Sequence, residues 1–502
     1  MAESATCERF NPDGRRGCRE CLSEGHEANA LVQGLRRKAA AVAARLTGSR
    51  AIPAESNSRG ALLRCGFVIA LTCCSGPGAA QASPDWNAQT LSGDWGGARA
   101  RMSERGLSTD ILYTGDVLAD ASGGTSRGAK YMDNVDIRFK LDLGKFAGWR
   151  GATALLHVIS DQGSGLNAHH VHSFMGVDNI EVNTNTAKLY QAWIKQRAFD
   201  GKLSALAGLY AVNSEFDVIE SSQVLLHPAF GTAPVLAQSG RNGPSIFPTT
   251  SFGARVRYQP NPAVYAQMAA LDGVPGDPNN PRGTHIRLER SDGAFLIAEV
   301  GFSPRRVETA FAPARDRRSA EPPRGSEQQR RLRPISKVAL GYWEYTARLD
   351  DLTDVNGEGN PIRRRSHGAY LLAEETLYQE RQGGQQGLAA FAGYGVAESN
   401  VNRVDCSLTA GLRYKGLLPG RDNDELALGL ARAHSSAKFR RVLSMETGEP
   451  SATAETAVEL TYRVQLRPWF AVQPVIQRIA RPGFGASSST AWIAGVRTKV
   501  AF

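Results

Sequence analysis

Three short runs in the sequence carry residue types that could do chemistry. The run Gly124-Thr125-Ser126-Arg127-Gly128 fits the G-x-S-x-G pattern around a serine nucleophile. The imidazoles of His169-His170-Val171-His172 could bind a transition-metal ion. Glu374 and Glu375 form a carboxylate pair, and glycoside hydrolysis uses two carboxyl groups.

The surroundings of each run argue against these activities. A nucleophile elbow needs an apolar strand before the serine, but Asp120-Ala121-Ser122-Gly123 precedes it, so we expect a hairpin loop. No spaced carboxylate or cysteine completes the histidine run as a metal site. Glu374 and Glu375 would point to opposite faces of a strand and could not flank one bond. We therefore expect no catalytic site, no metal site, no cofactor and no enzymatic activity.

The elements that would position any site are indicated by a strict alternation of apolar and polar residues. It is clear in residues 135–143, 252–258 and 458–466. These runs reach about nine or ten residues, enough to cross a bilayer when tilted, whereas strands of soluble sandwiches usually have about five or six. The pattern predicts an all-β fold, a transmembrane antiparallel β-barrel with apolar faces toward outer-membrane lipid. About 25 residues per strand and connection give about 16 strands.

The N-terminal region predicts export. Arg59 and Arg64 precede an apolar stretch of signal-peptide length, and Ala80-Gln81-Ala82 is a cleavage motif before Ser83. We assign 1–60 to an over-extended start, 61–82 to a signal peptide, 83–107 to an N-terminal segment with a short helix and 108–502 to the barrel. The chain ends in the aromatic Phe502, an ending that the barrel-assembly machinery of the Gram-negative outer membrane reads.

The positions of the cysteines and of the charged residues argue against a disulfide-rich protein and against a nucleic-acid-binding protein. Six of the seven cysteines precede Ser83, which leaves Cys406 alone and excludes a disulfide framework. Of the formal net charge of +10, residues 1–82 carry +4 (eleven Lys and Arg, seven Asp and Glu) and 304–334 carry +5 (nine Arg, four Asp and Glu). The remainder carries about +1, so no nucleic-acid partner is expected.

Several stretches resemble the OprB-type carbohydrate-selective porins. They are Leu91-Ser92-Gly93-Asp94-Trp95-Gly96-Gly97-Ala98-Arg99, Asn213-Ser214-Glu215-Phe216-Asp217-Val218, Asn242-Gly243-Pro244-Ser245-Ile246-Phe247-Pro248-Thr249, Ala373-Glu374-Glu375-Thr376-Leu377-Tyr378, Gly416-Leu417-Leu418-Pro419-Gly420-Arg421-Asp422 and Glu459-Leu460-Thr461-Tyr462-Arg463. The resemblance implies a water-filled outer-membrane barrel through which carbohydrate solutes, monosaccharides such as glucose, diffuse passively. The Arg- and Pro-rich insertion 304–334 departs from the family pattern and could bias the pore toward anions.

The segment Asn213–Thr249 interrupts the strand rhythm and is the expected constriction loop, because loops of this length are usually functional. Acids, amides, arginines and aromatics can replace water around sugar hydroxyls. The candidate pore-lining residues are Asn213, Glu215, Asp217, Arg241, Arg255, Arg257 and Trp193. Three alternatives stay open: a general or anion-biased porin, an exported all-β carbohydrate-active protein without a channel, and a structural barrel. A homo-oligomer also stays open.

Overall fold

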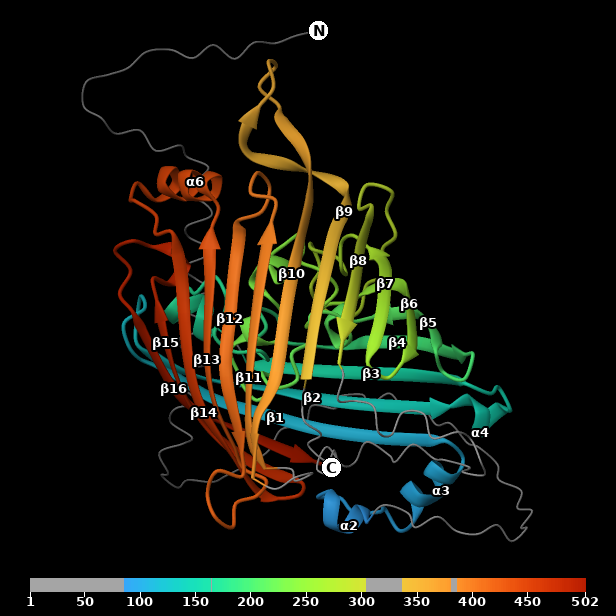
Figure 1. Ribbon diagram of the computed structural model, residues 1–502. Helices are drawn as coiled ribbons and strands as arrows, with labels where there is room; N and C mark the ends of the chain where they lie inside the picture. Colours follow the sequence, from blue (N-terminus) through green and yellow to red (C-terminus); the bar gives the residue numbers. More distant parts are fainter. Residues whose placement is uncertain (1–84, 164, 304–335, 381–385) are drawn as a thin grey trace, which may run out of the picture. The chain divides into compact units, whose positions relative to one another are not determined.

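The computed structural model describes residues 85–163, 165–303, 336–380 and 386–502. The predicted start region, signal peptide, cleavage site and 304–334 insertion lie outside these residues. Within them, sixteen antiparallel strands close into a barrel in which β1 pairs with both β2 and β16 (Figure 1). The predicted fold class and strand number are confirmed.

Strand lengths range from eight to twenty residues. The strands are β1 (Leu107–Ser122), β2 (Gly128–Asp142), β3 (Ala152–Gly163), β4 (Thr186–Ala198), β5 (Leu203–Tyr210), β6 (Ser251–Asn261), β7 (Val264–Asp272), β8 (Ala294–Phe302), β9 (Ser336–Val355), β10 (Pro361–Gln379), β11 (Gly387–Ala397), β12 (Val404–Lys415), β13 (Glu425–Ser435), β14 (Ala454–Arg467), β15 (Phe470–Ala480) and β16 (Ala491–Ala501). The helices are α2 (Trp86–Gln89), α3 (Ala98–Glu104), α4 (Leu143–Ala147), α5 (Pro234–Ala237), α6 (Ala437–Thr447), a π-helix η1 (Asn167–Val171), and 3-10 turns η2 (Val212–Ser214), η3 (Pro228–Phe230) and η6 (Pro482–Phe484).

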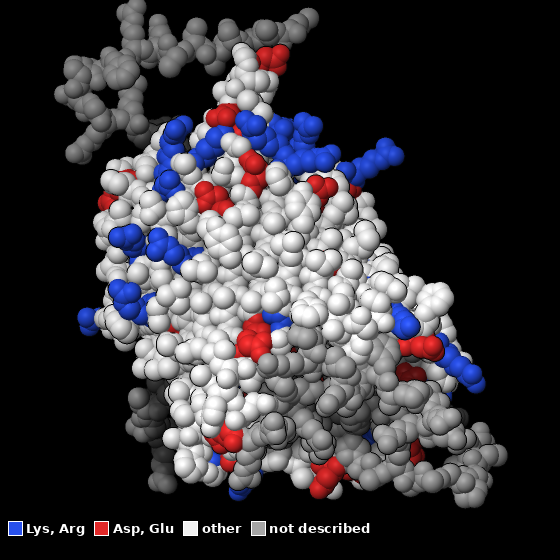
Figure 2. Space-filling model, in the orientation of Figure 1, with Lys and Arg blue, Asp and Glu red and all other residues white. Residues whose placement is uncertain are grey.

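The alternating apolar and polar residues of each strand form an apolar outer face and a polar inner face of the barrel. In β6, Phe252, Val256 and Tyr258 are exposed on the outer face, whereas Arg255 between them is buried. Exposed large apolar side chains are stable on a barrel surface only where lipid covers them. Figure 2 shows a broad, largely uncharged band across the visible face of the barrel. No helix in the described part of the chain is long and apolar enough to cross a bilayer.

The N-terminal segment holds two short helices, α2 and α3, where one was predicted. Arg99 of α3 joins this segment to the seam between the first and last strands. Its guanidinium donates to the Phe502 carbonyl (2.5 Å) and to Thr90 Oγ1 (2.8 Å), and it lies over the Trp95 ring at 4.1 Å. The backbone N–H of Phe502 in turn donates to the Ile111 carbonyl (2.9 Å).

Candidate functional site

Two connections fold into the barrel lumen from the end opposite the chain's C-terminus. Residues 165–185 join β3 to β4, and residues 211–250 join β5 to β6 (Figure 1). Both contain many fully buried side chains, among them Val177, Phe216 and Leu226. The predicted constriction segment Asn213–Thr249 is therefore an inward-folded loop packed against the barrel wall.

Buried glutamates on the inner wall hold these loops by accepting backbone N–H groups. Glu455 of β14 accepts from Ser173 Oγ at 2.7 Å and from the backbone of Phe174 and Met175 at 2.8 and 2.9 Å. Four residues along the same strand, Glu459 accepts from the N–H groups of Leu226 and His227, both at 2.7 Å. Such charge-assisted bonds satisfy loop backbone groups that no ladder can pair.

Glu374 of β10 holds the loop at a third point, accepting the Ser221 N–H and hydroxyl, both at 2.9 Å. Its side chain is buried and the neighbouring Glu375 points away, as strand geometry predicts. Glu374 is thus an anchor for the loop within the described structure.

Glu299 of β8 is the fourth anchor, and two tyrosines orient it. The hydroxyls of Tyr265 and Tyr370 each donate to one carboxylate oxygen at 2.7 Å. Each tyrosine ring lies across a glycine on the paired strand, Gly301 and Gly341, where an added Cβ would meet ring atoms at 2.2 and 2.1 Å. These glycines are needed for close approach of the aromatic rings.

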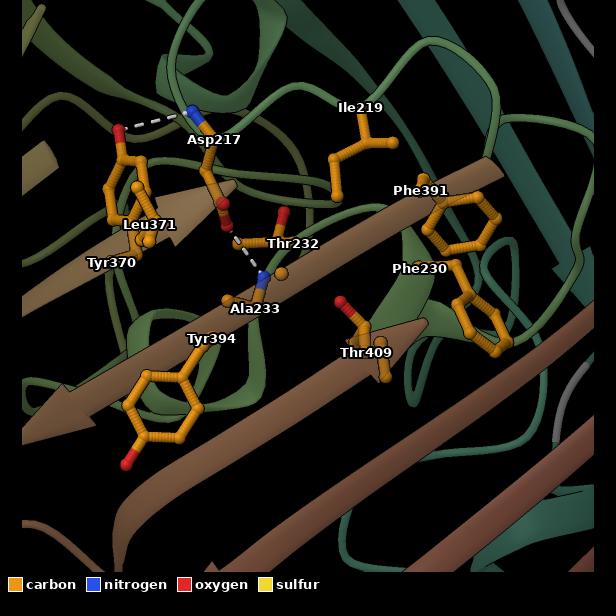
Figure 3. A pocket seen from close by; sticks show the side chains of 12 residues that line it. Asp217, Ile219, Phe230, Thr232, Ala233, Tyr370, Leu371, Phe391, Tyr394 and Thr409 are labelled. Atoms are coloured by element: carbon orange, nitrogen blue, oxygen red, sulfur yellow. Dashed lines mark hydrogen bonds between the residues drawn. The ribbon is translucent and has the colours of Figure 1, made fainter. Parts of the chain in front are cut away.

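Asp217 is placed in this anchoring system. Its backbone N–H donates to Glu299 at 3.0 Å. The same N–H donates to the Tyr370 hydroxyl at 3.2 Å, and the Asp217 carboxylate accepts from the Ala233 N–H at 2.7 Å (Figure 3). Burial, with Glu299 nearby, raises the pKa of Asp217 to about 7. The pocket beside it is only about 10 Å³, too small for a sugar. This position favours a structural role for Asp217.

Glu215 of the inward loop forms an ion pair with the buried Arg255 of β6 on the inner wall. Arg255 Nε lies 2.5 Å from one Glu215 carboxylate oxygen, and its NH2 donates to the other at 2.6 Å. Arg255 also donates to Ser204 Oγ at 2.6 Å. The Glu215 side chain keeps 24% of its surface exposed, while Arg255 keeps 1%, so the carboxylate is the accessible partner.

Arg257 on β6 and Trp193 on β4 lie on the inner wall, with β5 between their strands. Arg257 donates to Gln267 Oε1 at 2.8 Å and stacks over the Tyr265 ring at 4.0 Å. The indole N–H of Trp193 donates to Gln191 at 3.3 Å, and the ammonium of Lys195 lies 5.5 Å from its ring centre. The predicted candidate Trp193 therefore lies on the inner face of β4, together with Gln191 and Lys195.

The remaining two candidates lie at different places on the loop. Asn213 donates to Thr232 Oγ1 at 3.1 Å and lines a cavity of about 560 Å³. Arg241 instead reaches Asp292 in the 273–293 connection at 3.5 Å, with 38% of its side chain exposed. The seven candidates thus do not form one cluster.

The cavity is bounded by the two inward loops, the 273–293 connection and the upper parts of β3 and β4. Its polar lining residues include Asp161, Asp178, Asn179, Glu181, Asn183, Thr184, Lys188, Asn213, Thr232, Gln238, Asn242, Thr249, Asp277, Asn280, Thr284 and His285. Phe247 and several prolines provide apolar surface. Convergent polar groups with an aromatic wall are the features of a site that binds a small polar molecule.

Much of this lining was not predicted from the sequence. The 165–185 connection is also long for a hairpin, and its length is a signal that could have located it. The wall glutamates give a weaker signal in the sequence. The alternation pattern shows that a glutamate faces inward, but it is identical whether the side chain meets water or a loop backbone.

The catalytic-looking motifs are accounted for by loop contacts. Residues 123–127 connect β1 to β2, and the Ser126 hydroxyl lies 2.8 Å from His170 Nδ1. Among the described residues, no carboxylate hydrogen-bonds the other ring nitrogen of His170, so the pair joins two loops without completing a triad. His169 is bonded to the Gly165 carbonyl, and no group of three metal-ligating side chains is found in the part of the chain described.

A closed sixteen-stranded barrel with an apolar outside, a polar inside and loops folded into its lumen defines a channel protein of the Gram-negative outer membrane. The family model of the carbohydrate-selective porins of the OprB family matches residues 126–502, so the chain belongs to that family. It is a carbohydrate-selective outer-membrane porin.

One relative is similar to this chain in sequence, and two solved structures share its fold. Porin B of Pseudomonas aeruginosa is 26% identical over 449 residues, covering 83% of this chain and 92% of the relative. A high-pH structure of Pseudomonas putida OprB superposes with a TM-score of 0.70 at 24% identity, over 85% of this chain and all of the other. A low-pH structure of the same protein gives 0.51 at 22% identity, over 82% and 98%.

Proposed function

We propose that monosaccharides cross this barrel by passive diffusion, without bond chemistry, and that the inward loops form the selective part of the pathway. The observation that supports this most is the cavity of about 560 Å³ between the two loops. Its amide, hydroxyl and carboxylate groups can replace the hydration of sugar hydroxyls, and Phe247 can pack against a sugar ring.

Of the predicted pore residues, Asn213 and Glu215 are the best placed to contact solute. Asn213 lines the cavity, and Glu215 presents a partly exposed carboxylate fixed by Arg255. A fixed acceptor holds its geometry without reorganisation, yet a single hydrogen bond is weak enough to release a passing solute. Arg257 and Trp193 would act farther along the wall.

An anion-biased porin is the second candidate, favoured by the positive charge on the inner wall. Lys195 has Lys140, Arg197 and Arg255 as positively charged neighbours and Glu215 as a negatively charged one. Such a group would raise the local concentration of anions. Passage of neutral sugars and an anion bias can coexist in one channel.

Swelling of proteoliposomes that contain the full-length exported protein tests sugar selectivity, and the reversal potential of the channel in a salt gradient tests the anion bias. Uptake of a monosaccharide should exceed that of an amino acid of similar size and of a trisaccharide. Glu215→Gln, which removes the negative charge beside Arg255, should at least double the anion-to-cation permeability ratio, and the exposed hairpin variant Glu358→Gln should leave it unchanged. Equal uptake of all three solutes would refute sugar selectivity.

Two further expectations accompany this proposal. Recognition of Phe502 by the assembly machinery is a prediction, supported by its position at the end of β16 on the barrel seam. A homo-oligomer also stays a prediction.

A further inference from the structure

Two arginines lie side by side on the outer rim of the barrel. Arg348 of β9 and Arg365 of β10 are directly opposite each other in the ladder, and both are exposed. Opposite residues in a sheet have Cβ atoms only about 5 Å apart, and like charges at that spacing are destabilising. We call these two residues the rim pair.

Neither guanidinium of the rim pair has an acidic partner among the described residues. Nearby charges are engaged elsewhere: Arg363 pairs with Asp350 at 3.3 Å and donates to the Arg348 carbonyl at 2.6 Å. Glu344 accepts the Tyr342 hydroxyl at 3.2 Å. Neither arginine of the rim pair therefore has a direct ion-pair partner among the described residues, while the carboxylates of Glu344 and Asp350 lie on the same face of β9.

Apolar surface lies below the rim pair on the same alternating face of the two strands. Leu340 and Tyr342 on β9 are 55% and 47% exposed, and Leu371 on β10 is 49% exposed. The ladder is irregular between the two levels, but both strands keep the alternation. Figure 2 shows Lys and Arg gathered at the end where the β9–β10 hairpin projects, above the uncharged band.

We infer that the rim pair binds the phosphate of a phosphorylated membrane lipid whose acyl chains lie on Leu340, Tyr342 and Leu371. Guanidinium groups bind phosphate oxygens through paired N–H donors, and one phosphate between two arginines would replace their repulsion by attraction. A free phosphate would satisfy the charge but leave the apolar surface unused. The exposed apolar side chains farther along the same face, beyond Glu344, Thr346 and His367, point to a lipid.

The test uses the full-length protein purified in detergent, with bisphosphorylated lipid A and its dephosphorylated form as probes. Binding is followed by native mass spectrometry. The wild type should retain the phosphorylated lipid, and the double variant Arg348→Gln/Arg365→Gln should bind it about tenfold more weakly or worse, since two charge contacts to phosphate are lost. The matched control is Arg467→Gln, an exposed arginine at the other end of the barrel.

Three outcomes would overturn the inference: equal binding by wild type and double variant, equal binding of the dephosphorylated lipid, or inorganic phosphate competing as strongly as the lipid. A second measurement needs no lipid. Arg365→Gln alone should slightly raise the unfolding temperature in lipid-free detergent, because a like-charge pair is removed. Sugar uptake by the double variant should match wild type, so a failure here leaves the proposed channel function unaffected.

Discussion

At the residue scale, the buried carboxyl group of Asp217 links pH to the stability of the inward loop. Its pKa of about 7 in the folded protein lies above the value near 3.8 of an ordinary aspartate. The folded state therefore holds the proton more tightly than the unfolded chain. The resulting stabilisation is complete below pH about 4 and is lost as the pH rises through about 7. Glu299 disfavours the Asp217 charge, and Lys337 partly offsets this effect.

Replacing Asp217 by Asn should flatten this pH dependence, because the amide imitates the protonated acid and does not titrate. The unfolding temperature of Asp217→Asn in detergent should vary less between pH 5 and 8 than that of wild type. The exposed Asp422→Asn variant should retain the wild-type slope. An unchanged slope in Asp217→Asn would assign the pH dependence to other groups.

At the element scale, the wall glutamates decide where the long loop lies. Glu459→Gln keeps one acceptor oxygen but turns an amide N–H toward one of two backbone donors, Leu226 and His227. The lost charge-assisted bond should cost about 1.5–3 kcal/mol of loop anchoring. Single-channel recordings should then show larger open-state current noise and altered sugar flux.

The outward-facing Glu344→Gln is the matched control for this experiment, since the one side-chain hydrogen bond that Glu344 makes within the described residues is with Tyr342 on the same strand. If the open-state current noise of Glu459→Gln equals that of wild type, then Glu299, Glu374 and apolar packing hold the loop without Glu459.

At the scale of the whole molecule, Arg99 closes the barrel seam by connecting the N-terminal segment to the C-terminus. Arg99→Ala removes a charge-assisted bond to the Phe502 carbonyl and the stacking on Trp95, and should destabilise the barrel by about 2–3 kcal/mol. Arg99→Lys should not restore stability, because an ammonium lacks the planar fork. Thermal unfolding in detergent measures both.

The control is Arg101→Ala in the same helix, whose only described side-chain hydrogen bond is a long one of 3.4 Å to the Gly96 carbonyl. Equal losses for Arg99→Ala and Arg101→Ala would show that helix α3 matters through general packing, with no specific closure of the seam.

The sequence by itself determined the architecture. A strand that faces lipid on one side and polar groups on the other must alternate apolar and polar residues with a period of two. This alternation is visible in runs such as 252–258 and 458–466. The long segment from Asn213 to Thr249 could be recognised as a loop because it breaks that period. Membership of the family was likewise readable from short runs spread along the chain.

Only the tertiary structure decided how the lumen is filled. The sequence presents Asp217, Glu215 and Arg255 simply as charged residues in or beside the long loop. In the structure, Asp217 is buried beside Glu299, whereas Glu215 and Arg255 form an ion pair. Such contacts join residues as distant in sequence as Leu226 and Glu459. Local periodicity reports which face a side chain takes, whereas its partner is set by closure of the barrel and the path of the loop inside it.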